Sequence, residues 1–263
     1  MITLYAQIYA VMLVLGVLTW ILSLIKKDVS IVDSIWSLFF LFGSLTAYFY
    51  LDQPSFAHTL LILLVTIWAV RLSAYITRRN LGEDEDKRYQ DIRERYSPNF
   101  KFKSLFIIFT FQATLAAIIA LPLVYTLSQA AEINLIYGAG VFLWLIGFIF
   151  EAVGDAQLAA FKRNNSKEGA VMDKGLWRYT RHPNYFGECC LWWGYYLIAL
   201  SAGGWWTIIS PVIMTWLLLR FSGVALLEKD IVERRPAYRD YIQRTSAFFP
   251  MPVKKNSSEW AEN

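Results

Sequence analysis

The sequence predicts an all-α integral membrane protein built as a bundle of seven transmembrane helices. Of its 263 residues, 56% are hydrophobic and 17% are aromatic, which is too apolar for an ordinary soluble domain of this length. Seven apolar runs approach the roughly 20 residues needed to cross a hydrocarbon core about 30 Å thick. Nearly all Lys and Arg residues lie in every second connection between these runs. A multi-pass membrane protein accounts for all three observations.

The predicted spans cover most of the chain as one domain over residues 1–253, and the polar end, residues 254–263, is expected to be disordered. The first span is retained, because it lacks a basic start, is longer than the apolar core of a signal peptide and is followed by Lys26 and Lys27. The sixth span is the shortest. The expected spans are residues 2–25, 30–51, 56–76, 104–127, 133–154, 185–202 and 205–227.

Basic residues predict the orientation of the bundle. Of the 25 Lys and Arg residues, Arg71 and Arg220 lie inside spans, and the rest fall at 26–27, 78–103, 162–181 and in the tail. The connections on the other side carry none. Because basic loops stay in the cytoplasm, we expect the N-terminus outside and the C-terminus cytoplasmic. The net charge of +4 is then a signal of topology and gives no reason to expect a nucleic acid partner.

Soluble-type cofactor and metal sites are absent from the sequence. Cys189 and Cys190 are adjacent in an apolar run, so they cannot form an ordinary disulfide, and a packing role is favoured. No zinc spacing, phosphate-binding glycine loop or nucleophile elbow occurs. We expect no metal.

Ionisable residues inside spans mark function by default, because they are costly in a bilayer. Asp33 lies about one turn into the second span, where it either serves a site or only stabilises the helix start. Arg71 lies near the cytoplasmic end of the third span, where it either extends its charge to the surface or forms a polar pair with Tyr75, four residues on.

Two further groups of polar residues lie at the predicted cytoplasmic side. Glu151, Asp155 and Lys162 share one helix face, and such carboxylates act either as an acid/base pair or as hydrogen-bonding groups for a ligand or an arginine. The loop at 78–103 mixes acidic and basic residues and predicts a solvated helical face.

The stretch "LWRYTRHPNYFGE", residues 176–188, places basic side chains at the start of an apolar helix. Arg178, Arg181 and His182 are expected to converge with the free amides of the helix start, a geometry that suits phosphate or carboxylate. Anionic lipid headgroups are the alternative. Asn184 and Glu188 lie deeper on one helix face, where lipid contact explains neither, so we favour a ligand.

These residues carry a resemblance. "GLWRYTRHPNYFGE" followed by "LLEKDIVERRPAYRDYIQRTSAFFP", together with "SIVDSIWS" and "RRNLGEDEDKRYQDIRE", resembles the steroid 5-alpha-reductase C-terminal family, and within it a bacterial branch of uncharacterised, reductase-like membrane proteins. Related sterol reductases and isoprenylcysteine-type methyltransferases share the "RHPxYxG" core. The resemblance covers nearly the whole chain.

The resemblance implies a seven-helix enzyme of the bacterial inner membrane that holds NADPH from the cytoplasmic side. It implies hydride transfer to an activated C=C bond, of the enone type, in a lipophilic steroid- or isoprenoid-like substrate that enters from the bilayer. Asn184 and Glu188 match residues beside the nicotinamide and ribose. With the basic cluster, the expected cofactor-binding residues are Arg71, Asp155, Lys162, Arg178, Arg181, His182, Asn184, Tyr185, Glu188, Glu228, Arg235, Tyr238 and Tyr241.

The chain departs from the steroid enzymes on the substrate side. Trp68 stands where they have a carbonyl-polarising Tyr, and no Gln-Glu pair occurs near the second span. Glu151 replaces an Asn and Glu228 a Tyr. A protonated Asp33 is therefore our expected donor to the substrate oxygen, with Tyr75 as a second donor and Glu188 completing the catalytic set.

Two other functions stay open from the sequence. One is an S-adenosylmethionine-dependent methyltransferase acting on a lipid or prenylated substrate, with the same helix mouth for the cofactor and the tail as a lid. The other is a non-catalytic lipid-binding protein of the membrane. The natural substrate, the stereochemistry, the choice between NADPH and NADH, and the oligomeric state are not fixed by the sequence.

Overall fold

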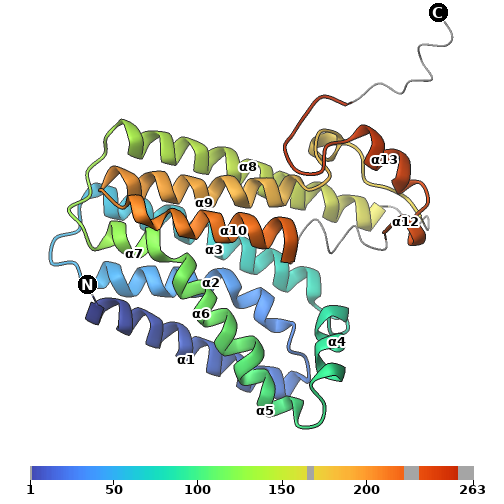
Figure 1. Ribbon diagram of the computed structural model, residues 1–263, viewed down its shortest axis with the longest axis horizontal. Coiled ribbons are helices and arrows are strands. Elements are labelled where there is room, and N and C mark those ends of the chain that lie inside the picture. The colour runs from blue at the N-terminus through green and yellow to red at the C-terminus, as the bar shows by residue number, and fades with distance from the viewer. Residues whose placement is uncertain (1, 165–168, 222–230, 254–263) are drawn as a thin grey trace, which may run out of the picture. The chain divides into compact units, whose positions relative to one another are not determined.

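The computed structural model describes residues 2–164, 169–221 and 231–253, and its regular elements there are all helical. An isolated bridge joins Thr180 and Ser246. The prediction of an all-α fold is thus confirmed for the described residues (Figure 1). The main helices are α1 (Ile2–Lys26), α2 (Ile31–Phe49), α3 (Phe56–Asn80), α4 (Lys87–Arg95), α5 (Phe100–Ser104), α6 (Phe111–Ile119), α7 (Leu121–Leu127), α8 (Leu135–Asn164), α9 (Pro183–Ser201), α10 (Ile209–Trp216), α12 (Ile231–Arg234) and α13 (Tyr238–Arg244).

Five helical stretches in the described ranges are long and apolar enough to cross a membrane, so the chain is a multi-pass membrane protein. They are α1, α2, α3, the continuous stretch Phe100–Ile119 and α8. The other two predicted spans are also helical, as α9 and as the shorter apolar stretch Trp205–Arg220. The count of seven spans and the orientation stay predictions.

The described chain divides into two compact units. Unit 1 comprises Met1–Tyr137 and Ala199–Ser210, and unit 2 comprises Gly138–Ile198 and Pro211–Asn263. Both are built from apolar helices whose outer faces leave many large hydrophobic side chains exposed. In a membrane protein such faces contact lipid, because the bilayer takes the place of water as the solvent.

In unit 1, α1, α2 and α3 pack side by side and α6 lies against α1 (Figure 1). Gly43 of α2 allows close contact with α1, since a Cβ there would lie 2.4 Å from the Cε atom of Met12. Hydrogen bonds join the helices where lipid could not satisfy polar groups: Ser37 Oγ donates to the carbonyl of Ala69 at 2.8 Å, and Tyr5 OH donates to that of Ala117 at 2.7 Å.

In unit 2, α8 and α9 run side by side with their backbones in contact (Figure 1). A Cβ added to Gly147 would lie 2.5 Å from the carbonyl oxygen of Gly187, and one added to Gly140 would lie 2.8 Å from that of Gly194. Only residues without a side chain allow helices to approach so closely. This contact fixes which residues of α8 lie beside the start of α9.

The C-terminal segment of unit 2 is attached to the connection between α8 and α9. Residues 178–182 and 241–251 are joined by hydrogen bonds, among them Arg181 N to Ser246 O at 2.9 Å and Met251 N to Tyr179 O at 3.0 Å. Thr180 Oγ1 donates to the carbonyl of Phe248 at 2.8 Å. Residues 254–263, which we expected to be disordered, lie outside the described residues.

A single methyl group at the α8–α9 contact is expected to destabilise unit 2. Gly147→Ala forces the helices apart, which costs about 1–3 kcal/mol of overpacking energy and exceeds the gain in helix propensity. Gly138→Ala is the matched control, because a Cβ at Gly138 has no heavy atom within 4 Å. Thermal unfolding in detergent should show a lower Tm for Gly147→Ala than for Gly138→Ala. Equal Tm values would contradict the contact.

Candidate functional site

Three polar residues gather where α8 passes the start of α9. Glu151 and Asp155 lie one turn apart on α8 and are 2% and 4% exposed, and Asn184 is the second residue of α9. Asn184 Nδ2 donates to Asp155 Oδ1 at 3.2 Å. We call Glu151, Asp155 and Asn184 the acidic mouth. The positive end of the α9 helix dipole favours carboxylates at this position.

Asn184 presents a hydrogen-bond acceptor at the acidic mouth. Because Asp155 accepts from its Nδ2 group, its Oδ1 atom must face elsewhere. That atom is buried and accepts no hydrogen bond from the described residues. A buried acceptor without a donor is costly in a native protein, and Asn184 Oδ1 is able to accept from an N–H or O–H group.

The connection before α9 is held on α8 by its own hydrogen bonds. Trp177 is buried and its indole N–H donates to the carbonyl of Gly154 at 3.0 Å. Gln157 Oε1 accepts from the amide of Leu176 at 3.0 Å. Gly175 has a φ of 61° and lies against the Gln157 side chain, so a residue with a Cβ would be strained there.

The basic residues of this connection differ in their surroundings. Arg181 is buried, and its Nη1 group donates to the carbonyls of Thr245 at 2.6 Å and Ile242 at 3.1 Å. His182 is buried and stacks on Tyr185, with ring centroids 5.6 Å apart. Arg178 is exposed. Arg181 thus binds backbone carbonyls of the C-terminal segment, and the expected convergence of Arg178, Arg181 and His182 on one anion stays a prediction.

Two tyrosines of α13 lie close to this connection. Tyr241 OH donates to the carbonyl of Trp177, and burial raises the pKa of Tyr241 above its ordinary value. The Tyr238 ring packs 5.2 Å from the Tyr241 ring. Arg235 is exposed and donates to the carbonyl of Ala170 at 3.0 Å.

The remaining residues expected at the cofactor are two described side chains and one residue outside the described ranges. Glu188 is half-buried one turn beyond Asn184 on α9. Lys162 is exposed near the end of α8. Glu228 lies outside the described residues.

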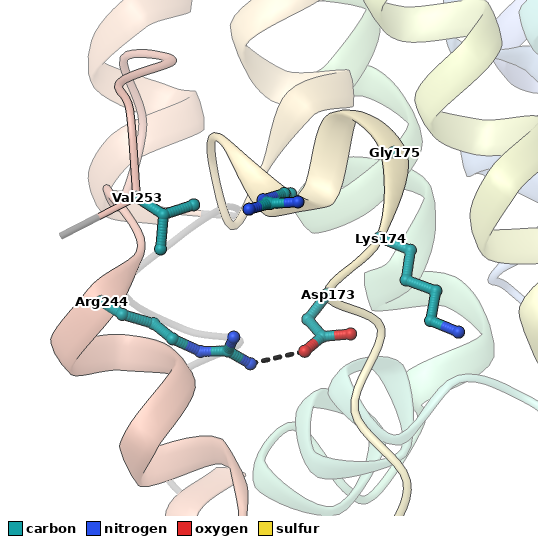
Figure 2. A pocket seen from close by; sticks show the side chains of 6 residues that line it. Asp173, Lys174, Gly175, Arg244 and Val253 are labelled. Carbon is teal, nitrogen blue, oxygen red and sulfur yellow. Dashed lines mark hydrogen bonds and ion pairs between the residues drawn. The ribbon is translucent and has the colours of Figure 1, made fainter. Parts of the chain in front are cut away.

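A pocket of about 380 Å³ opens beside the same connection. It is lined by Asp173, Lys174, Gly175, Arg178, Arg244 and Val253. Figure 2 shows the ion pair of Arg244 with Asp173, a contact of 2.5 Å, and the Lys174 side chain pointing away from that pair. A second pocket of about 300 Å³ shares Lys174 and Gly175 and follows α8 past Gln157. We call the first of these the basic pocket.

Asp33 of unit 1 has partners that the sequence interpretation did not include. Arg88 Nη2 lies 2.8 Å from Asp33 Oδ2, and Tyr89 OH donates to Asp33 Oδ1 at 2.6 Å. Gln112 donates in turn to the Tyr89 hydroxyl at 3.2 Å. Asp86, the residue before α4, binds the same guanidinium at 2.9 Å. Asp33 thus anchors α4 to the start of α2.

The charges at α4 stabilise one another. Burial disfavours the Asp86 carboxylate, but the hydrogen bonds from Arg88 outweigh it, so the pKa of Asp86 lies below its ordinary value. Burial and the neighbouring Asp33 charge raise the pKa of Tyr89, which stays a neutral donor. Tyr89 packs into a cluster with Val29, Val32 and Phe109. Lys87, Asp91 and Glu94 of α4 are exposed, so the predicted solvated face is confirmed, and the sequence interpretation missed only the burial of Tyr89.

The remaining candidates of unit 1 lie on α3. Arg71 and Tyr75 form the same-face pair that their spacing predicts, with the guanidinium carbon 6.0 Å from the ring centroid, and both are half-buried. Trp68 is fully buried and packs 5.7 Å from the Phe40 ring.

Sequence reasoning missed Arg88, Tyr89, Asp173 and Arg244 as partners in polar clusters. For Arg88 and Tyr89 the local signal is an acidic residue directly before a helix. That residue is Asp86, whose side chain accepts from the amide of Arg88 at 3.0 Å. The pairing of Asn184 with Asp155 joins two residues that the sequence singled out separately.

Comparison with known proteins places the chain in a family. A family model described as "Protein of unknown function (DUF1295)" matches residues 19–245. An uncharacterised protein of Schizosaccharomyces pombe (strain 972 / ATCC 24843) is 28% identical over 282 residues, which cover 94% of this chain and 79% of the relative. No solved structure matches the chain. The family match includes the acidic mouth, α4 and Arg244.

Loss of the Tyr89 hydroxyl is expected to loosen α4. Tyr89→Phe removes a hydrogen bond to a charged group, worth about 1.5–3 kcal/mol, so amide exchange of residues 87–95 should accelerate by about 10-fold or more. Tyr96→Phe is the control, since Tyr96 follows α4 and is 41% exposed. Hydrogen exchange read by mass spectrometry measures both variants. Unchanged exchange in Tyr89→Phe would show that the Asp33 contact does not hold α4.

Proposed function

The chain belongs to the DUF1295 family, and we propose that it is an NADPH-dependent reductase of an activated C=C bond in a lipophilic substrate. The sequence motif that carries the resemblance to membrane reductases, "RHPNYFGE", begins at Arg181 and forms the start of α9. Support comes from the acidic mouth, where that motif meets α8. The observation that carries the proposal is the buried Oδ1 atom of Asn184, which accepts no hydrogen bond from the described residues.

The polar groups of the acidic mouth fit one end of a nicotinamide cofactor. Glu151 and Asp155 are carboxylates, and Asn184 offers an oxygen, so the cluster supplies acceptors. Ribose hydroxyls and a carboxamide N–H supply the matching donors, whereas a phosphate would be repelled by the two carboxylates. We therefore assign the acidic mouth to the nicotinamide–ribose portion and not to the phosphates.

The residues of unit 2 would then bind and orient the cofactor. When bound, NADPH would supply a hydride to the β-carbon of the activated C=C bond. Asn184 would accept from the cofactor while Asp155 holds its amide in place, and Glu188 lies one turn further along the same helix. The C-terminal segment, fixed through Arg181 and Tyr241, would limit the access of water to the site.

The proton donor to the substrate oxygen needs a group that stays protonated. Asp33 is already bound by the Arg88 guanidinium and the Tyr89 hydroxyl, so we assign Asp33 to the support of α4. Tyr75 keeps the donor role in this proposal. Its hydroxyl belongs to a half-buried ring whose centroid lies 6.0 Å from the Arg71 guanidinium carbon, and a neutral tyrosine hydroxyl is able to donate to a developing oxyanion.

We also propose the orientation that the basic residues favour, with the N-terminus outside and the acidic mouth toward the cytoplasm, in the bacterial inner membrane. The substrate would reach the protein from the bilayer, as a steroid- or isoprenoid-like molecule. The many exposed apolar side chains of both units are consistent with lipid contact.

A second candidate is methyl transfer from S-adenosylmethionine to a lipid or prenylated substrate. The observation that favours it is the pair of buried carboxylates, Glu151 and Asp155, because carboxylates also suit the ammonium and ribose groups of that cofactor. The acidic mouth therefore suits either cofactor, and a binding measurement distinguishes NADPH from S-adenosylmethionine.

NADPH is expected to stabilise the detergent-purified protein, and Asn184→Ala is expected to reduce the effect. At 100 times its Kd a ligand adds about 2.7 kcal/mol to the free energy of unfolding, which a rise in Tm reports. Loss of the Asn184 acceptor should weaken NADPH binding about 10-fold. Asn80→Ala is the control, because Asn80 Oδ1 accepts from Arg79 at 3.1 Å at the end of α3.

The same assay with NADH and S-adenosylmethionine distinguishes the functions. A shift with NADPH that Asn184→Ala reduces and Asn80→Ala keeps would support the reductase and justify a screen of enones for NADPH oxidation. A shift with S-adenosylmethionine alone would replace it by methyl transfer. The absence of a shift with all three cofactors would favour a non-catalytic lipid-binding protein.

A further inference from the structure

The basic pocket lies on a different face of α8 from the acidic mouth. Gly175 and Lys174 border the pocket, and Gly175 packs on Gln157. Gln157 follows Asp155 by two residues, which turns its side chain by roughly 200° about the helix axis. The second pocket, which is lined by Gln157 and shares Lys174 and Gly175 with the basic pocket, therefore lies on the side of α8 that faces away from Asp155.

This side of α8 continues the lipid-facing stripe of the helix. Ile149 and Val153 are exposed apolar residues one turn apart, and Gln157 is the next residue in that row. Alanine and phenylalanine follow in the second pocket, at positions 160 and 161. The two pockets thus begin where the apolar surface of α8 ends.

The chemistry of the basic pocket suits a phosphate group. Arg244 is held by Asp173 at 2.5 Å and lies over the Tyr241 ring, with its guanidinium carbon 6.0 Å from the ring centroid. A guanidinium has five N–H donors in a fixed plane, so the ion pair orients Arg244 and leaves further donors. Arg178 adds a second guanidinium to the lining, and paired guanidinium groups bind phosphate well.

Exposed apolar side chains lie next to this charge. Tyr179 follows Arg178 directly and is 47% exposed, and Phe249 and Met251 are 62% and 54% exposed. The Met251 amide donates to the carbonyl of Tyr179, which brings the backbones of these two segments together. A ring contact joins Phe249 to Phe186, at 6.1 Å. Basic and apolar groups side by side are typical of surfaces at the lipid headgroup level.

We propose that the basic pocket binds the phosphate of an anionic membrane lipid, whose acyl chains lie over Tyr179, Phe249 and Met251. Charge complementarity selects an anionic lipid over a zwitterionic one. The apolar surface selects a lipid over a free phosphate ester. The site would fix the connection before α9 and the C-terminal segment at the membrane surface.

The test measures lipid binding by the full-length protein in a neutral detergent. Dioctanoyl phosphatidylglycerol is titrated against dioctanoyl phosphatidylcholine, and the rise in Tm gives the affinity. Arg178→Gln should weaken phosphatidylglycerol binding about fivefold, the value of one basic residue at an anionic surface. Arg178→Lys should recover part of the loss. Arg95→Gln is the matched control, because Arg95 is an exposed arginine at the end of α4.

Two further probes identify the source of the phosphate. Glycerol 1-phosphate, which lacks acyl chains, should bind much more weakly than phosphatidylglycerol. Phe249→Ser should weaken the binding of phosphatidylglycerol and leave that of glycerol 1-phosphate unchanged. Equal binding of glycerol 1-phosphate and the lipid would overturn the proposal, as would equal effects of Arg178→Gln and Arg95→Gln. Displacement of phosphatidylglycerol by NADPH, lost in Arg178→Gln, would assign the pocket to the cofactor and reject the lipid. Because NADPH binding is measured separately through Asn184, failure of the lipid proposal leaves the reductase proposal untouched.

Discussion

The contact between the backbones of α8 and α9 determines the geometry of unit 2. Glycines on both helices remove the side chains that would keep the axes apart, so Gly147 and Gly187 meet at backbone distance. Because a helix is rigid, this contact fixes the register of α8 against α9 and so places Glu151 and Asp155 beside the start of α9. The pairing of Asn184 with Asp155 follows from it. A site at the acidic mouth therefore depends on residues that have no chemistry of their own.

Arg181 attaches the C-terminal segment to the connection before α9. The C-terminal end of α13 carries carbonyls without helical partners, and Arg181 donates to those of Ile242 and Thr245. A buried guanidinium is stable only when its charge is matched, and helix C-terminal carbonyls supply partial negative charge. The arginine of the motif, Arg181, thus attaches the C-terminal segment, which explains why it does not line the basic pocket.

The all-α class and five of the predicted spans could be read from the sequence, because hydropathy and the need to satisfy backbone groups act locally. Same-face pairs such as Arg71 and Tyr75 were also predictable, since they depend only on helix periodicity. The position of α4 was not. Its charged composition predicts solvation, and only the folded chain brings Tyr89 and Arg88 to Asp33 across more than 50 positions. For the same reason, the attachment of the C-terminal segment by Arg181 could not be predicted.

Residues two positions apart on an α-helix point to nearly opposite sides of it. The two sides of α8 can therefore lie beside groups of opposite charge. On α8, the row that ends in Asp155 carries carboxylates at the acidic mouth, while the row that ends in Gln157 leads to the guanidinium groups of Arg178 and Arg244. If these groups shared one face, the guanidinium groups of Arg178 and Arg244 would lie within reach of Glu151 and Asp155. Arg244 shows this effect where it does occur, since Asp173 engages one edge of its guanidinium. The body of α8, with its backbone hydrogen bonds closed internally, lies between the two sets. The two-residue offset between Asp155 and Gln157 thus turns these two side chains to nearly opposite sides of α8.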